Sequence, residues 1–168
     1  MQTEQPSERG RHHVIIVDDD PDIRESFTQI LEARGYSVDT AETGKVFLDK
    51  TKKNAYDLAI VDLKLPDMEG VELLRYMRQI SPKTKKIVIT GYPTLESAID
   101  AMGSGTDAYL LKPVEPEDFL RVVEQKIRER DETEILTADE TRGQAKQIYA
   151  RKGHSNRQTI AHSKGDRT

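Results

Sequence analysis

Chemically active side chains stand directly after four apolar runs of strand length in this sequence of 168 residues. Val14–Val17 precedes Asp18, Asp19 and Asp20, Leu58–Val61 precedes Asp62, Ile87–Ile89 precedes Thr90, and Ala108–Leu111 precedes Lys112. In an open parallel sheet the carboxyl ends of the strands meet at one edge, and ligand sites form outside that edge. We therefore expect these side chains to converge on one site.

The residue types predict what such a site holds. Converging carboxylates repel one another and become harder to ionise, so a hard divalent cation with oxygen ligands, Mg²⁺, is the natural counter-charge. A lysine ammonium and a threonine hydroxyl can hold the oxygens of a phosphoryl group. A single aspartate after a strand is more often a helix cap or a turn residue. Four polar strand ends in this order favour a functional site over four unrelated caps.

Strand-like runs alternate with amphipathic stretches of helix length from residue 13 to residue 130, which predicts five strand–helix units on a parallel sheet. The first helix is expected to begin at Pro21 and to end by Gly35, and Asp20 is expected to cap it. Tyr36–Thr40 is polar enough to be an edge strand, whereas Leu58–Val61 is apolar throughout, as a strand buried on both faces is. The predicted fold class is α/β, doubly wound.

The two ends of the chain differ from this middle part. Residues 1–12 are polar and predict a mobile leader. Residues 131–168 predict a helix extension that frays and then a mostly disordered basic tail. From Arg142 onward the chain has seven basic residues and one acidic residue. The four histidines, at positions 12, 13, 154 and 162, all fall in segments that we predict to be mobile, so we expect none of them to be a phosphohistidine or a metal site.

Composition excludes several classes of protein. With no cysteine, the chain has no disulfide, no thiolate metal site and no cysteine nucleophile. No apolar run approaches the roughly 20 residues that span a bilayer, and the first residues lack the apolar stretch of a signal peptide. We expect a cytoplasmic protein that does not insert into membranes.

Four segments together resemble the response-regulator receiver domains of two-component phosphorelays, from about Val14 to Arg130. They are Val14-Ile-Ile-Val-Asp-Asp-Asp-Pro21, Ile60-Val-Asp-Leu-Lys-Leu-Pro-Asp-Met-Glu-Gly70, Ile87-Val-Ile-Thr-Gly91 and Ala108-Tyr-Leu-Leu-Lys-Pro113. The resemblance implies a flavodoxin-like (βα)5 sheet with strand order 2-1-3-4-5. It also implies a signalling protein rather than a turnover enzyme.

The resemblance further implies a role for each residue of the site. Asp62 would accept a phosphoryl group from a sensor histidine kinase or a phosphotransfer protein. Asp18, Asp19, Asp62 and the backbone carbonyl of Lys64 would hold Mg²⁺.

Three further residues would act on the phosphoryl group or respond to it. Lys112, through a cis bond to Pro113, would pair with the phosphoryl oxygens. Thr90 and Tyr109 would move as a switch that couples phosphorylation to the protein surface.

That surface comprises the fourth helix, the fifth strand and the fifth helix, and here it includes Tyr92, Leu95 and Tyr109. The family uses it to bind a downstream protein partner or to form a phosphorylation-linked homodimer. Lys64 and Tyr92 resemble positions that tune the lifetime of the phosphoryl group, and we expect their bulk to slow its hydrolysis.

Two other functions are open at this point. A phosphohydrolase of the haloacid-dehalogenase type would use Asp18 as nucleophile and Asp20 as acid/base, but it leaves Asp62 unexplained and the chain has no cap insertion. A DNA-associated regulator would bind through the basic tail, which lacks a helix-turn-helix pattern and holds Tyr149 as its only aromatic residue. We therefore do not expect nucleic acid as a partner.

Overall fold

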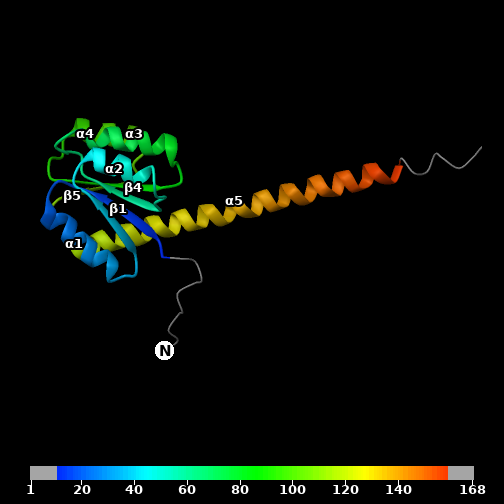
Figure 1. Ribbon diagram of the computed structural model, residues 1–168, viewed down its shortest axis with the longest axis horizontal. Coiled ribbons are helices and arrows are strands. Elements are labelled where there is room, and N and C mark those ends of the chain that lie inside the picture. Colours follow the sequence, from blue (N-terminus) through cyan, green and yellow to red (C-terminus); the bar gives the residue numbers. More distant parts are fainter. Residues whose placement is uncertain (1–10, 159–168) are drawn as a thin grey trace, which may run out of the picture. The chain divides into compact units, whose positions relative to one another are not determined.

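The computed structural model describes residues 11–158, and five of its segments form one parallel sheet in the order β2-β1-β3-β4-β5 (Figure 1). The strands are β1 (His13–Val17), β2 (Ser37–Ala41), β3 (Leu58–Val61), β4 (Lys85–Thr90) and β5 (Ala108–Leu111). The helices are α1 (Pro21–Glu32), α2 (Gly44–Thr51), α3 (Gly70–Ile80), α4 (Leu95–Gly103) and α5 (Pro116–Gln158). The predicted doubly wound α/β fold and its strand order are confirmed.

The chain divides into two units, Met1–Arg130 and Asp131–Thr168. The first unit holds the whole sheet, and the described part of the second consists of the end of α5. For residues 131–168 we expected a helix extension that frays and then a mostly disordered basic tail, and in the structure α5 continues to Gln158. No proline interrupts residues 131–158, and an isolated glycine such as Gly143 costs a helix only about 1 kcal/mol. The predicted leader up to residue 10 and the tail from residue 159 lie outside the described residues.

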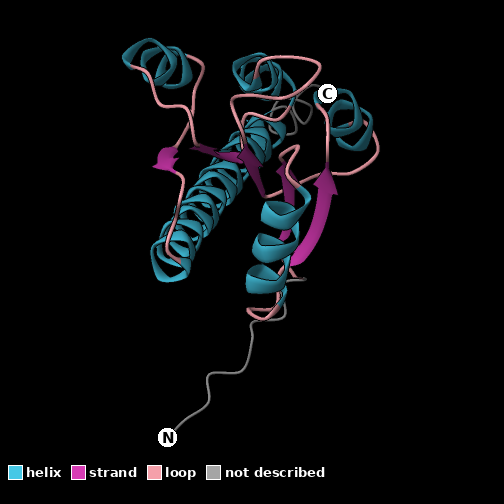
Figure 2. Ribbon diagram, turned by 90° about the vertical axis from the view of Figure 1, so that its left-hand side faces the viewer, coloured by secondary structure: helices cyan, strands magenta, loops and turns pink. Residues whose placement is uncertain are grey.

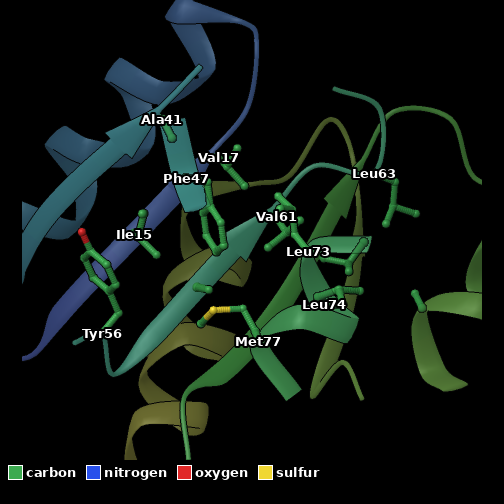
Figure 3. Close-up of a cluster of buried hydrophobic side chains, with 13 residues drawn as sticks. Ile15, Val17, Ala41, Phe47, Tyr56, Val61, Leu63, Leu73, Leu74 and Met77 are labelled. Atoms are coloured by element: carbon green, nitrogen blue, oxygen red, sulfur yellow. The ribbon is translucent and has the colours of Figure 1, made fainter. Parts of the chain in front are cut away.

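Helices cover both faces of the sheet (Figures 1 and 2). Alternate strand residues supply the two cores. On one face, α2, α3 and α4 pack over a buried cluster drawn in Figure 3. That cluster includes Ile15, Val17, Phe47, Val61, Leu73, Leu74 and Met77. On the other face, α1 and α5 pack over Val14, Ile16, Ile60 and Ile87. There the rings of Phe27 and Phe119 stack with centroids 4.3 Å apart, which fixes the two helices against each other.

Local sequence explains where the helices begin. The Asp20 carboxylate accepts hydrogen bonds from the backbone N–H groups of Asp22 and Ile23, so it caps α1 as predicted. Thr94 and Ser97 form a reciprocal capping box at the start of α4. These caps set the loops that follow β1 and β4, which are the loops that carry Asp18 and Thr90.

Helix α4 exposes most of its apolar side chains. Leu95 is 79% exposed, Ile99 59% and Met102 71%, and only Ala101 of this helix is buried. Tyr92, in the loop before α4, and Leu111, the last residue of β5, are also largely exposed. We name Tyr92, Leu95, Ile99, Met102 and Leu111 the α4 surface. Within the described residues, no helix is long and apolar enough to cross a membrane.

The end of the sheet opposite the predicted site carries paired charges. His13, which we expected in a mobile segment, is instead the first residue of β1, and its Nε2 lies 3.2 Å from an Asp39 carboxylate oxygen. The Tyr56 hydroxyl donates to that same carboxylate at 2.6 Å. The Asp57 carboxylate accepts from the backbone N–H of His13 at 2.8 Å and lies 2.7 Å from Nη2 of Arg130. The histidine therefore belongs to the folded unit and is held by its partners.

Candidate functional site

Two aspartates meet at the carboxyl ends of β1 and β3 because these strands pair in parallel and in register. Val17 lies opposite Val61, so the next residue on each strand, Asp18 and Asp62, lies at the same level. The strand order reverses beside β1, where open α/β sheets form their ligand sites. Asp18 is 3% exposed and Asp62 is 6% exposed, so both carboxylates are shielded from bulk water.

Asp19 completes a cluster of three carboxylates. One oxygen from each of Asp18, Asp19 and Asp62 lies within 4.8 Å of the others, and Asp19 is exposed to solvent. Burial raises the pKa of Asp18, against the opposing effect of its hydrogen bond from Lys112. This oxygen-only set, with two buried members and one open to solvent, fits a hard divalent cation such as Mg²⁺.

Lys112 supplies the positive charge within the site. Its Nζ donates to the Asp18 carboxylate at 2.6 Å and to the Asp62 carboxylate at 3.0 Å. Burial alone would lower the pKa of Lys112, but the two carboxylates outweigh it and raise the pKa above its usual value. The Lys112–Pro113 peptide bond is cis, as the resemblance implied. One ammonium therefore faces two buried carboxylates, and the site has an excess of negative charge.

Thr90 lies at the end of β4 with no exposed surface. Its hydroxyl oxygen accepts the backbone N–H of Tyr92 at 3.2 Å, and its carbonyl accepts the N–H of Lys112 at 2.9 Å. The Thr90 hydroxyl proton remains available to a further acceptor. Tyr109 on β5 packs its ring against the core beneath α4, and its hydroxyl lies 3.3 Å from Oγ of Ser97. Tyr109 therefore touches the capping box of α4.

Lys64 lies two residues beyond Asp62, in the loop before α3. Its backbone N–H donates to the Asp62 carboxylate at 3.2 Å, and its side chain pairs with Glu69 at 3.0 Å. Lys64 and Tyr92 both line a cleft of about 480 Å³ between α3 and α4, which also holds Glu72 and Asp100. The two residues predicted to shield a phosphoryl group thus line the same cleft, although Asp62 itself is not part of its lining.

Two residues of the loop between Asp62 and α3, Gly70 and Asp67, hold this part of the site in place. The Gly70 N–H donates to the Leu63 carbonyl at 2.8 Å, and a Cβ at Gly70 would clash with the Asp62 carbonyl oxygen and lie 2.8 Å from Leu63 Cα. Only glycine allows α3 to begin this close to the chain at Asp62. In the sequence, the only indication of this role is a glycine placed directly before an amphipathic helix.

Asp67 ties the same loop to α2. Its carboxylate accepts the backbone N–H groups of Gly44 and Lys45, each at 2.9 Å. Slight desolvation raises the pKa of Asp67, but the hydrogen bonds from these N–H groups outweigh it and lower the pKa below its usual value. Sequence reasoning missed this contact because α2 lies more than 20 positions away along the chain.

Arg24 supports the site from α1. Its Nη1 donates to the Asp18 carbonyl at 2.7 Å, which holds the loop after β1 against the helix. The arginine stands one turn into α1, on a stretch predicted only as an amphipathic helix.

Known proteins match this arrangement. The pattern of the response regulator receiver domain matches residues 14–124. The cell cycle response regulator CtrA of Brucella ovis is 30% identical over 115 residues, which cover 68% of this chain and 50% of that protein. The chain therefore spans about half the length of the curated relatives it matches.

Solved structures give the same likeness. A CheY-like response regulator receiver domain protein from Methanospirillum hungatei JF-1 is 42% identical with a TM-score of 0.73, covering 74% of this chain and 99% of that one. The beryllofluoride-activated NtrC4 receiver domain dimer is 33% identical with a TM-score of 0.67, covering 70% of this chain and 98% of that one.

Proposed function

This chain belongs to the response regulator receiver domains, signalling proteins of two-component systems, and we propose that its Asp62 accepts a phosphoryl group from a phosphohistidine. The donor is a sensor histidine kinase or a phosphotransfer protein. The bond that forms joins an Asp62 carboxylate oxygen to phosphorus. The bond that breaks joins phosphorus to the donor histidine nitrogen, which leaves with the electron pair. The chain acts as a phosphoacceptor and switch rather than as a turnover enzyme.

One observation carries this proposal: Asp62 is buried beside both a carboxylate cluster and Lys112. Receiver domains bind Mg²⁺ at such an acidic pocket, and Asp18, Asp19, Asp62 and the backbone carbonyl of Lys64 would hold it here. When bound, Mg²⁺ supplies positive charge that offsets the repulsion between the carboxylates and the incoming phosphoryl oxygens. Lys112 already reaches Asp62 and holds one phosphoryl oxygen after transfer.

Thr90 and Tyr109 pass the change to the surface. The Thr90 hydroxyl donates a hydrogen bond to a phosphoryl oxygen. Because the Tyr92 N–H is hydrogen-bonded to that hydroxyl, the loop at Tyr92 moves toward Asp62 with it. Tyr109 responds at its contact with Ser97 and so shifts the start of α4. The charge that the phosphoryl group adds at Asp62 thereby shifts the surface from one of two conformations to the other.

The α4 surface is the binding face of this switch. Its exposed apolar side chains form a patch of the kind that marks a protein interaction site. A downstream protein partner or a second copy of the chain binds there when Asp62 is phosphorylated. Gel filtration with and without beryllofluoride tests the second of these partners, since beryllofluoride imitates the phosphoryl group.

Acetyl phosphate with Mg²⁺, followed by intact mass and borohydride trapping, tests the chemistry. We expect one Mg²⁺-dependent phosphoryl adduct at Asp62, abolished in Asp62→Asn and retained in the control Asp20→Asn, which changes the same charge at a cap. An adduct at Asp18 with continuous phosphate release would support the phosphohydrolase alternative instead. No adduct at all would leave a binding module that works without phosphorylation.

A further inference from the structure

The loop before α3 is closed by contacts between its own two ends. The Gly70 N–H donates to the Leu63 carbonyl at 2.8 Å. Lys64 and Glu69 form an isolated antiparallel bridge, and their side chains pair at 3.0 Å. These contacts shape the loop into a hairpin, but they do not by themselves determine where the tip of the hairpin lies.

At its tip the loop meets the start of α2. The Asp67 carboxylate accepts the backbone N–H groups of Gly44 and Lys45, each at 2.9 Å. Leu65 and Met68 pack against the core on the same face, and a Cβ at Gly44 would clash with Sδ of Met68. Apolar packing is not directional, whereas two hydrogen bonds to one carboxylate set both a distance and an orientation. Asp67 therefore fixes the position of the tip on α2.

The same loop carries two backbone groups that matter to Asp62. The Lys64 N–H donates to the Asp62 carboxylate at 3.2 Å, and the Lys64 carbonyl is the backbone ligand that we propose for Mg²⁺. Asp67 follows Lys64 by three positions, so a shift of the tip displaces this carbonyl. Mg²⁺ demands a nearly ideal octahedral arrangement of its ligands, so a small displacement of one ligand weakens binding.

We propose that Asp67 is a positioning residue for the Mg²⁺ site and couples that site to the N-terminus of α2. Asp67 acts through the loop: it holds the segment that carries the Lys64 carbonyl and is not itself a ligand. The inference rests on the proposed function, because it needs the Mg²⁺ site at Asp62. Removing a residue that orients a metal ligand typically weakens metal binding about 10- to 100-fold. Because such coupling is reciprocal, Mg²⁺ bound in the acidic pocket also strengthens the contact between Asp67 and α2.

Calorimetric titration of the 168-residue chain with Mg²⁺ tests the positioning role. We expect Asp67→Ala to raise the dissociation constant for Mg²⁺ about tenfold, and Asp67→Asn, which keeps one acceptor oxygen, to raise it less. Thr43→Ala is the matched control, because the Thr43 hydroxyl caps the same helix at the Val46 N–H, at 3.2 Å, and not at the loop. Thr43→Ala should leave Mg²⁺ binding unchanged. An equal loss in both alanine variants would assign the effect to the stability of α2 and would overturn the proposal.

The rate of adduct formation separates positioning from catalysis. With acetyl phosphate, we expect Asp67→Ala to need about ten times more Mg²⁺ for half of its maximal rate. Its maximal rate should stay within about twofold of that of the unmodified chain, because saturating Mg²⁺ restores the site. A lower maximal rate with an unchanged Mg²⁺ requirement would contradict the proposal and leave the Asp62 chemistry intact. Absence of any Mg²⁺-dependent adduct in the unmodified chain would instead refute the proposed function, and this inference with it.

Amide hydrogen exchange tests the coupling to α2 in the absence of a phosphoryl donor. We expect Mg²⁺ to slow exchange of the Gly44 and Lys45 N–H groups, which Asp67 holds. The Val46 N–H, which is bound to Thr43, should be slowed less. In Asp67→Ala this difference should vanish, and circular dichroism establishes that the variant is folded. Equal slowing of all three amides in the unmodified chain would show that Mg²⁺ does not act on α2 through Asp67.

Discussion

Strand β3 has an aspartate just outside each end, and the two carboxylates lie in opposite electrostatic settings. Asp57 precedes the strand and is paired with Arg130 at 2.7 Å and with the His13 N–H at 2.8 Å. Asp62 follows the strand and shares the single ammonium of Lys112 with Asp18. The two carboxylates are separated by only four strand residues.

This difference separates a structural carboxylate from a reactive one. A carboxylate that is paired with a cation of its own contributes to stability, because its removal costs that cation an ion pair. A carboxylate that shares one cation with its neighbours is stabilised when a new positive or electrophilic ligand binds to it. The charge around each carboxylate therefore distinguishes the two ends of β3: Asp57 has the guanidinium of Arg130, whereas Asp62 and Asp18 share the one ammonium of Lys112.

Removing each carboxylate in turn is the strongest test of the comparison. We expect Asp57→Ala to lower the free energy of unfolding by about 2–3 kcal/mol, since Arg130 is only 18% exposed and loses its ion pair with Asp57. Asp62→Ala should change it by less than about 0.5 kcal/mol without Mg²⁺, because Lys112 keeps Asp18. Urea unfolding measures both. Equal losses for the two variants would break the comparison.

A pair of glycine variants sharpens the description of the Asp62 end. Gly70→Ala forces the backbone at Asp62 and Leu63 to move, and we expect a loss of about 2 kcal/mol together with slower phosphorylation. Gly91→Ala is the matched control, because its Cβ would meet the Lys112 side chain at an ordinary 3.8 Å. Urea unfolding and the rate of adduct formation report the two effects. A Gly70→Ala protein as stable as Gly91→Ala would show that the start of α3 does not need to lie so close to the backbone at Asp62.

The opposite end of the sheet predicts an alkaline effect. Burial and the hydrogen bond to Asp39 raise the pKa of Tyr56 to about 12 from its usual 10.0. A raised pKa means that this stability is fully present below pH 10 and is lost as pH rises toward 12. Tyr56→Phe should cost about 1 kcal/mol at neutral pH and should flatten the loss of stability above pH 10. An unchanged slope between pH 10 and pH 12 would contradict the assignment.

The smallest expected effects concern the rim of the site. Lys64 and Tyr92 are 58% and 72% exposed, so they shield a phosphoryl group only in part. Lys64→Ala and Tyr92→Ala should each speed the loss of phosphoryl from Asp62 about twofold by admitting water. The decay of the trapped adduct measures this, and an unchanged rate in both variants would sink the hypothesis.

The sequence by itself determined the order of the strands and helices and the polar residue at each strand end. These features are local, because a strand or helix pattern and the residue that ends it are read within a few positions. These features predicted a site at the carboxyl edge of the sheet. The likeness to receiver domains implied the strand order. The roles of the site residues in phosphoryl transfer stay predictions until the adduct is mapped.

Only the tertiary structure decided which partners each residue has. Lys112 meets Asp18 across 94 positions and Asp62 across 50, and Asp67 meets α2 across more than 20. The sequence marks Asp57 and Asp62 alike, as aspartates at the ends of one apolar run, and their difference depends on Arg130 and Lys112 arriving from distant elements. Periodicity could not show that the apolar face of α4 is exposed, because it indicates that a helix has an apolar face but not whether the fold covers it; only the resemblance to receiver domains pointed to this surface.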